Sequence, residues 1–305
     1  MSLPRIAARI FNAPLLYDEA KAIAFLAGLG GRLVDGGVVL TNAMPAIDHV
    51  AFENGRPSLG KVGDRLGRVM DARGIVPFDM VGSVAVIAVE GTLVHKGAFV
   101  GSASGETSYQ GLQAQVVRAQ RSEAVKGVVF EIDSFGGEAA GAFQTADMIA
   151  KLSAQKPTLA ILTDNALSAG YLLAAPARQI VMPAEGRTGS IGVLRMLVDA
   201  RGKLEKEGLK VTLITSGKHK ADGHPATEAS EELMARMKVE ADAMRVTFAD
   251  SIGRYRGQRF TSAQALATEA QHYGAEDSIR LGLADAIGDS HEAFAEFVDA
   301  INRKG

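Results

Sequence analysis

Two kinds of segment alternate through the middle of this chain, and they differ in the spacing of their apolar residues. Short runs of apolar, β-branched residues, such as those at 83–89 and 127–132, predict strands that are buried on both faces of a sheet. Segments with apolar residues at helical spacing separate these runs, and this alternation is typical of an α/β fold with a mostly parallel sheet. Strands are expected at 83–89, 127–132, 158–162, 179–182 and 209–215, and helices at 109–122, 139–152, 169–175 and 196–207.

The two ends of the chain have different patterns. Residues 1–74 are punctuated by glycines, with helices expected at 18–29 and 61–72 and a short strand at 38–40. We interpret them as an N-terminal extension that packs on the main domain or on a partner. We therefore divide the chain into an extension at 1–74, a main domain at 75–290 and a C-terminal helix at 291–305. After residue 215, helices are expected at 227–256, 262–269, 275–281 and 291–302.

The expected helix at 227–256 carries an apolar stripe at Leu233, Met237, Met244 and Phe248. A stripe at this spacing is more often ordinary core than interface. A helix of this length nevertheless spans about 45 Å at 1.5 Å per residue, which is longer than one small domain needs. We therefore expect part of it to project beyond its own domain and to bury apolar surface on a neighbour, in a closed homo-oligomer.

Composition excludes several classes of function. Among the 305 residues there are no cysteines, which removes disulfides, thiolate metal sites and cysteine nucleophiles together. The net charge of −2 gives no global field that would recruit nucleic acid. Charges at Asp18, Glu19 and Lys21 interrupt the stretch where a signal peptide would be apolar, and no apolar run reaches the ~18–20 residues of a membrane span. We expect a soluble, cytoplasmic protein with no membrane anchor.

Ser168 is the first candidate for chemistry. It stands between an expected strand and an expected helix, with the small residues Ala169 and Gly170 after it. Backbone N–H groups point outward at a helix N-terminus, and the helix dipole there favours negative charge. A serine in this place suits a nucleophile, but it also suits the common role of N-cap.

Two glycine-containing segments can complete such a site. Gly136 and Gly137 directly follow a buried strand, and backbone N–H groups left uncovered by side chains are the donors of an oxyanion hole. A tight turn that requires positive φ explains such a pair equally well. The segment 188–193, TGSIGV, either lines a cleft or crosses between two elements, and we favour a wall of the substrate groove with Ile191 in it and Ser190 as a secondary polar contact.

A serine nucleophile needs a base, and the segment 216–222, SGKHKAD, offers candidates. A lysine can serve when burial and neighbouring cations keep it neutral, as in Ser–Lys variants of the serine triad. His95 and His219 are the alternatives for a Ser–His arrangement, and a lysine-rich loop is most often simply solvated. Neither a metal-ligand motif nor a phosphate-binding glycine loop is present in the sequence, so no metal and no cofactor are expected.

Six segments occur in an order that resembles the signal peptide peptidase A family of serine peptidases, which has a ClpP/crotonase-like fold. They are VAVIAVEGTL, VKGVVFEIDSFGGE, DNALSAGYLLA, GRTGSIGV, TSGKHKAD and YGAEDSIRLGLADAIG. The resemblance places the nucleophile on Ser168, the general base on Lys220, and the oxyanion donors on Gly136 or Gly137 and on Ala169. Phe135 stands where the family commonly has proline, which leaves the shape of that side of the substrate groove open.

The N-terminal stretch ARIFNAPLLYDEAKAIAFLAGL resembles the phage and prophage branch of this family. That resemblance implies an endopeptidase that processes capsid or scaffold proteins during head maturation, with capsid, portal or scaffold proteins as partners and a homo-oligomeric ring as the active form. A cytoplasmic housekeeping peptidase that degrades membrane-derived or misfolded peptides is the second hypothesis. The third, from another class, is an acyl-thioester-binding or non-catalytic crotonase-like protein.

Overall fold

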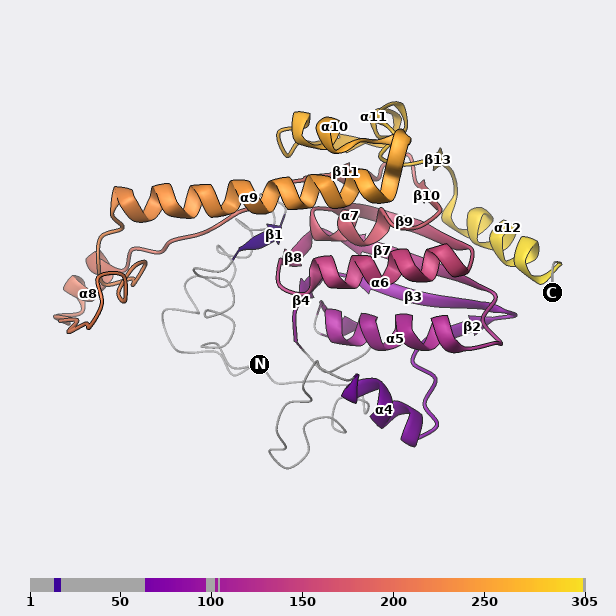
Figure 1. Cartoon of the computed structure of the whole chain (residues 1–305), viewed down its shortest axis with the longest axis horizontal. Helices are drawn as coiled ribbons and strands as arrows, with labels where there is room; N and C mark the ends of the chain where they lie inside the picture. Colours follow the sequence, from indigo (N-terminus) through magenta and orange to yellow (C-terminus); the bar gives the residue numbers. More distant parts are fainter. Residues whose placement is uncertain (1–13, 18–63, 97–101, 104, 304–305) are drawn as a thin grey trace.

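A computed structural model describes residues 14–17, 64–96, 102–103 and 105–303 (Figure 1). The main sheet has the strand order β12-β11-β9-β7-β3-β2. Beside β11, β10 pairs with the first part of β9, and β13 pairs with β10. Its inner pairs are parallel, and the pairs at its two edges, β2 with β3 and β11 with β12, are antiparallel. The strands are β2 (Asp79–Val81), β3 (Val84–Glu90), β7 (Gly127–Ser134), β9 (Thr158–Leu167), β10 (Gln179–Met182), β11 (Arg187–Gly189), β12 (His272–Gly274) and β13 (Ala286–Ile287).

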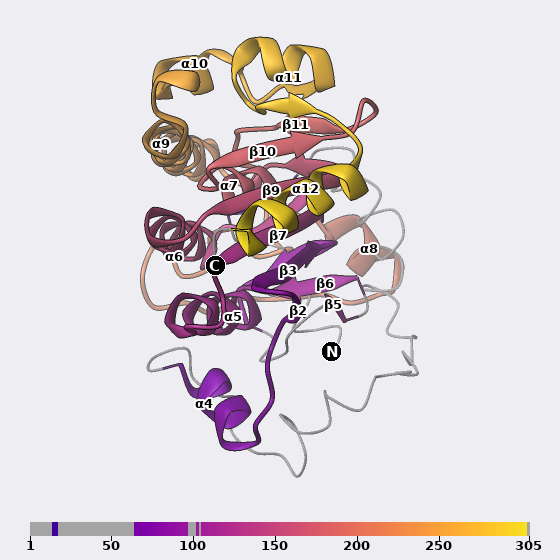
Figure 2. The same cartoon turned by 90° about the vertical axis from the view of Figure 1, so that its right-hand side faces the viewer.

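Helices cover both faces of this sheet (Figure 2). Alternate side chains of a strand point to opposite faces, so Val128 and Phe130 of β7 enter the larger apolar cluster while Val129 enters the smaller one. The larger cluster lies under α5 (Tyr109–Arg121), α6 (Ala142–Gln155) and α7 (Ala169–Ala174), and the smaller one under α12 (Ser290–Asn302). The predicted α/β class, with a mostly parallel sheet, flanking helices and a helical C-terminal part, is confirmed.

A second, smaller sheet has the order β1-β8-β4-β6-β5. Its strands are β1 (Leu15–Tyr17), β4 (Thr92–Val94), β5 (Ser102–Ala103), β6 (Glu106–Ser108) and β8 (Gly136–Glu138). The predicted extension thus supplies one strand, and it also supplies α4 (Arg65–Ala72), whose Leu66 and Met70 pack against Ala114 of α5. The helix expected at 18–29 and the strand expected at 38–40 lie outside the described residues.

Residues 195–230, which we call the arm, extend away from the two sheets (Figure 1). The arm contains α8 (Arg201–Lys206) and leads into α9 (Glu231–Arg256), of which Phe248, Ala249 and Ile252 are buried in the main core. The predicted strand at 209–215 is wrong: this segment pairs with no strand in the described structure and is exposed, with Ile214 97% accessible. Its alternating pattern indicates a strand only when a partner strand is available.

The apolar stripe predicted on the long helix is divided between two surroundings. Leu233 and Met237 are buried outside the larger apolar cluster, whereas Phe248 is buried within it. The apolar residues that do remain exposed lie elsewhere on α9 and on the arm. They are Met234, Val239, Val246, Leu209, Val211, Leu213 and Ile214.

The end of α9 is held by a buried ion pair. The Arg256 side chain is fully buried and contacts Asp285 at 2.9 Å, and Asp285 Oδ2 also accepts the backbone N–H of Ile180 at 2.8 Å. Burial alone would raise the pKa of the Asp285 carboxyl, but the hydrogen bonds and charge of Arg256 lower the pKa below its usual value. The pair joins α9, which packs against α10 (Ser262–Ala267), to the segment after α11 (Ala275–Leu281). In the described part of the chain, every helix is too short or too polar to cross a bilayer.

Candidate active site

Ser168 occupies a strained turn between β9 and α7. Its backbone has φ 54° and ψ −120°, a conformation that costs a residue other than glycine about 1–3 kcal/mol. Two backbone hydrogen bonds hold the turn: the Ser168 N–H donates to the Gly189 carbonyl at 2.9 Å, and the Ser168 carbonyl accepts the Leu172 N–H at 3.0 Å. A strained serine between a strand and a helix is the arrangement that presents a nucleophile in other hydrolase folds.

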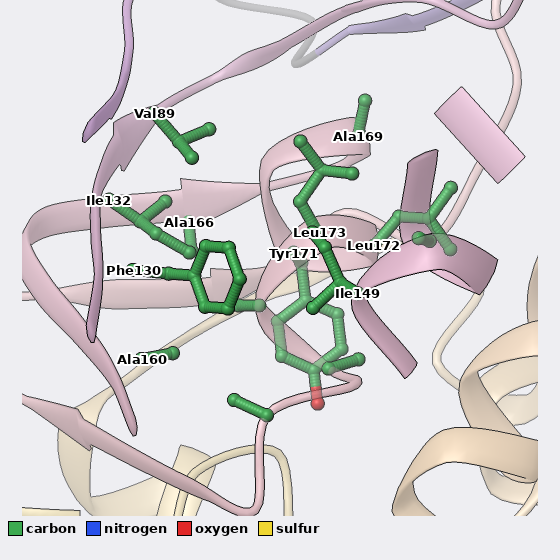
Figure 3. Packing of buried hydrophobic residues seen from close by; sticks show 14 of the residues in the cluster. Val89, Phe130, Ile132, Ile149, Ala160, Ala166, Ala169, Tyr171, Leu172 and Leu173 are labelled. Carbon is green, nitrogen blue, oxygen red and sulfur yellow. The ribbon is translucent and has the colours of Figure 1, made fainter. Parts of the chain in front are cut away.

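The helix after this turn is packed rigidly. Figure 3 shows Tyr171 and Leu173 of α7 among side chains of the sheet, including Phe130 and Ile132. All residues of α7 are fully buried, and the Tyr171 hydroxyl donates to the Leu283 carbonyl at 2.9 Å. Because burial also raises the pKa of Tyr171, this hydroxyl stays a neutral donor. The N-terminus of α7 is therefore held in place beside Ser168.

The Ser168 hydroxyl has no hydrogen-bond partner among the described residues, and the whole residue is buried. A serine that serves as an N-cap accepts a hydrogen bond from the first turn of its helix, and Ser168 makes no such bond. A buried hydroxyl without a partner loses its hydration without compensation and is rare in folded proteins. The N-cap explanation for this serine is thus not supported, and the hydroxyl is available for another partner.

Gly136 lies directly against this serine. Its φ is +97°, and a Cβ at this position would lie 2.1 Å from the Leu16 carbonyl oxygen, 3.0 Å from the Ser168 Cβ and 3.1 Å from the Ala169 nitrogen. Glycine is therefore required here both by conformation and by space. The Gly136 N–H already donates to the Ser134 hydroxyl at 3.1 Å, and that hydroxyl donates to the Gly91 carbonyl at 2.6 Å.

These contacts separate the predicted oxyanion donors. The Gly136 N–H is committed to Ser134, a residue that sequence reasoning missed although its hydroxyl stands two positions before the glycine. The Ala169 N–H belongs to the first residue of α7, which has no acceptor within the helix. Gly137 lies in β8, one residue farther along. The Gly136 N–H is bonded within its own turn, whereas the Gly137 N–H faces Leu16 of the separate strand β1, so Gly137 and Ala169 stay the two candidate donors.

Lys220 lies far from its own Ser168. It is exposed, in a turn of the arm that is tied to the first turns of α9 by the Lys218–Glu232 pair at 3.0 Å and by the Asp222–Arg236 pair. Phe248 marks the point where α9 meets the core. At 1.5 Å per residue, Glu232 and Arg236 lie about 18–24 Å along the helix from it. A single chain therefore does not bring the two predicted catalytic residues together, and Figure 1 shows the segment around α8 well away from α7 and β9.

The two histidine alternatives are not bonded to Ser168 either. The backbone N–H of His95, beyond β4, donates to a Glu138 carboxylate oxygen at 2.8 Å, and His219 lies 3.0 Å from Asp222 in the exposed turn that also holds Lys220. Within residues 14–17, 64–96, 102–103 and 105–303, no group of three or more His, Asp or Glu side chains is placed to hold a metal ion.

The three predicted groove residues lie on segments that adjoin Ser168. Phe135 is half-buried and precedes Gly136. Ser190 has φ 55°, follows the strand that pairs with the end of β9, and donates its backbone N–H to the Gln271 carbonyl at 2.9 Å. Ile191 is fully buried in the larger apolar cluster, together with Leu16 of β1. Leu15 and Leu16 were not predicted to take part, since three apolar residues after a proline do not distinguish a strand from a loop.

Comparison with known proteins gives this geometry a context. The model of peptidase family S49 matches residues 150–302. The capsid assembly protease C of Escherichia phage lambda is 34% identical over 303 residues, which are 99% of this chain and 67% of that protein. The head-tail preconnector protein GP5 of Enterobacteria phage P21 is 34% identical over 301 residues, which are 99% of this chain and 58% of that protein.

Solved structures of similar fold are more distant. An enoyl-CoA hydratase from Shewanella pealeana matches with a TM-score of 0.43 and 13% identity over 73% of this chain and 72% of its own. The 1510-N membrane protease specific for a stomatin homolog from Pyrococcus horikoshii matches with a TM-score of 0.42 and 12% identity. The match covers 71% of this chain and 79% of that protease chain. The family model and the phage relatives decide the assignment: this chain belongs to peptidase family S49.

Proposed function

We propose that this chain is a serine endopeptidase that uses Ser168 as nucleophile and Lys220 as general base, and that it processes capsid or scaffold proteins during phage head maturation. The observation that carries the proposal is the buried, unpartnered hydroxyl of Ser168 on a strained turn, with Gly136 directly against the residue and the N–H group of Ala169 beside it. The relatives named as capsid assembly protease and head-tail preconnector support the substrate class.

Each step then has a group to perform it. The Ser168 Oγ attacks the carbonyl carbon of the scissile peptide bond while its proton passes to the Nζ of Lys220. The N–H groups of Gly137 and Ala169 stabilise the negative charge on the carbonyl oxygen. The C–N bond breaks as the lysine returns the proton to the leaving amine. Water then attacks the acyl ester, giving its proton to the lysine, and the Ser168 hydroxyl is restored as the carboxylic acid leaves.

Lys220 reaches Ser168 from a neighbouring subunit in this proposal. The arm projects from the body, carries Lys220, and exposes apolar side chains such as Leu209 and Ile214. A closed ring would bury this apolar surface between subunits. Large exposed apolar patches commonly mark such contact surfaces. Burial between subunits would also remove water from the lysine ammonium group, which favours the neutral amine that a base must be.

The experiment is co-expression of this chain with the coat, scaffold and portal proteins of its phage, followed by intact-mass spectrometry. The wild-type chain is expected to cleave at least one of them at a defined bond, and Ser168→Ala to lose about 10⁴-fold or more of the rate. Lys218→Ala, which removes an exposed lysine from the same turn, is the matched control and should keep most of the activity.

Two outcomes would contradict the proposal. Cleavage by a folded Ser168→Ala chain at the wild-type rate would exclude Ser168 as the nucleophile. Cleavage of unfolded peptides by the wild type, with every head protein left intact, would favour a housekeeping peptidase in place of a maturation protease.

A further inference from the structure

The strand β1 (Leu15–Tyr17) lies between two segments that border Ser168. On one side it pairs antiparallel with β8, with Leu16 opposite Gly137. On the other side Leu15 and Leu194 exchange both backbone hydrogen bonds, each 2.9 Å long. The segment of Leu194 begins just after Ser190 in sequence. The strand β1, which belongs to the N-terminal region, therefore lies between β8 and the segment that follows β11.

The register determines where the groups of Leu16 point. In an antiparallel strand, successive residues direct their N–H and C=O groups to opposite edges. Leu15 uses both of its groups toward Leu194, so the groups of Leu16 face β8. The same follows from the other side, because the Ala139 N–H donates to the Pro14 carbonyl at 3.3 Å. Hydrogen-bonded pairs alternate along the ladder, which makes Leu16 and Gly137 the next such pair.

The Leu16 carbonyl thus accepts the Gly137 N–H, one of the two suitable oxyanion donors. Its oxygen is also close to the other donor. A Cβ added to Gly136 would lie 2.1 Å from the Leu16 oxygen and 3.1 Å from the Ala169 nitrogen, so oxygen and nitrogen are separated by no more than the sum of these distances. The same added Cβ would lie 3.0 Å from the Ser168 Cβ, so the Leu16 oxygen and the Ser168 Cβ are also separated by no more than the sum of 2.1 and 3.0 Å. This is the region in which a carbonyl under attack by Ser168 has to lie.

The remaining features of β1 agree with a bound peptide. The Leu16 side chain is fully buried in the larger apolar cluster, as an anchoring side chain in a specificity pocket would be. Ser168 itself is inaccessible to solvent, so a substrate reaches it only after something that covers it has moved. An extended peptide that pairs with exposed strand edges is a common form of peptide recognition.

We propose that β1 occupies the peptide-binding groove as a built-in substrate mimic, with Leu16 in the position of the residue whose carbonyl Ser168 attacks. The folded chain is then self-inhibited, and a substrate must displace β1. It also follows that the groove selects an extended segment with a leucine-like side chain before the scissile bond. The inference rests on the proposed function, since it takes Ser168 as the nucleophile.

The first test is a pair of variants in the full chain, Leu16→Ala and Leu66→Ala. Both remove a buried leucine of the N-terminal region, but Leu66 lies on α4, away from the groove. With a short fluorogenic peptide that carries leucine before the scissile amide, Leu16→Ala is expected to raise kcat/KM by about 10-fold or more over wild type, because its β1 is more easily displaced. Leu66→Ala should leave the rate unchanged. A folded Leu16→Ala chain with the wild-type rate, or a lower one, overturns the inference.

The second test does not depend on catalysis. A fluorescent peptide with the sequence of residues 12–19, NAPLLYDE, is titrated into Ser168→Ala chains with and without Leu16→Ala, and binding is followed by anisotropy. The double variant is expected to bind at least about 10-fold more tightly, because its own β1 competes less well. Equal binding, or equal binding of a scrambled peptide, refutes the inference. If the double variant binds more tightly but the wild type cleaves no peptide, the inference that β1 occupies a peptide-binding groove stands and the proposed function is refuted.

Discussion

Replacing Ser168 by glycine should stabilise this protein while it abolishes activity. Ser168 combines two features that destabilise a fold: φ 54° and ψ −120° at a residue other than glycine, and a buried hydroxyl without a partner. Glycine adopts this conformation without a steric penalty and carries no hydroxyl. The cost that the chain bears at this position is explained if the serine is kept for chemistry.

The magnitude can be assembled from the separate contributions. Relief of the backbone strain is worth about 1–3 kcal/mol. Removal of the unpaired hydroxyl contributes a further ~1–3 kcal/mol. Against these gains stands the greater freedom of glycine in the unfolded chain, which costs about 0.5–1 kcal/mol. The free energy of unfolding of Ser168→Gly should therefore exceed that of wild type by at least about 1 kcal/mol, and Ser168→Ala, which keeps the strain, should lie between the two.

Urea denaturation followed by circular dichroism at one protein concentration measures these differences. The series is repeated in a Lys220→Ala background, so that a bond between serine and lysine in an assembled ring does not enter the comparison. A Ser168→Gly chain that is less stable than its parent in that background would refute the view that this position is strained.

Three further outcomes are expected. Asp285→Asn leaves the buried Arg256 without its charge partner and should lower the free energy of unfolding by about 3–5 kcal/mol, whereas Asp277→Asn, in an exposed pair with Arg280, should change it by less than about 0.5 kcal/mol. Because the pKa of Asp285 is lowered by folding, its stabilisation is present above the unfolded-state pKa and is lost as pH falls through the folded-state pKa, so acid titration should remove the difference between Asp285→Asn and wild type. Ile214→Asp, on the exposed arm, should give smaller species than the wild type in light scattering and should abolish cleavage, and a fully active monomer would contradict the proposed ring.

The strands of the main sheet could be predicted because their residues carry a local signal. The runs at 127–132 and 179–182 are apolar and β-branched, and they correspond to β7 and β10. The same signal failed at 209–215, where no neighbouring strand is available within the described chain and the apolar side chains remain exposed. Pattern thus reports a tendency to pair, while the presence of a partner is a property of the whole fold.

The candidate site was predictable to a similar degree. The sequence places Ser168 at a strand-to-helix turn and puts Gly137 after a neighbouring strand, and both positions follow from local pattern. It contains no local signal for the commitment of the Gly136 N–H to Ser134, which depends on the path of one turn. It contains none for the pairing of Leu16 with Gly137, because these residues are far apart in the chain and meet only in the folded sheet.

The central claim is that Ser168 and Lys220 act as one catalytic pair contributed by two subunits, and mixing two inactive variants tests it most directly. Ser168→Ala and Lys220→Ala chains, each inactive alone, are refolded together at equal concentrations and assayed on the fluorogenic peptide. Random co-assembly in a closed ring gives about one quarter of the sites a serine from one chain and a lysine from its neighbour, so about one quarter of the wild-type activity should return. Mixed rings that are confirmed by native mass spectrometry but show no activity would contradict the claim.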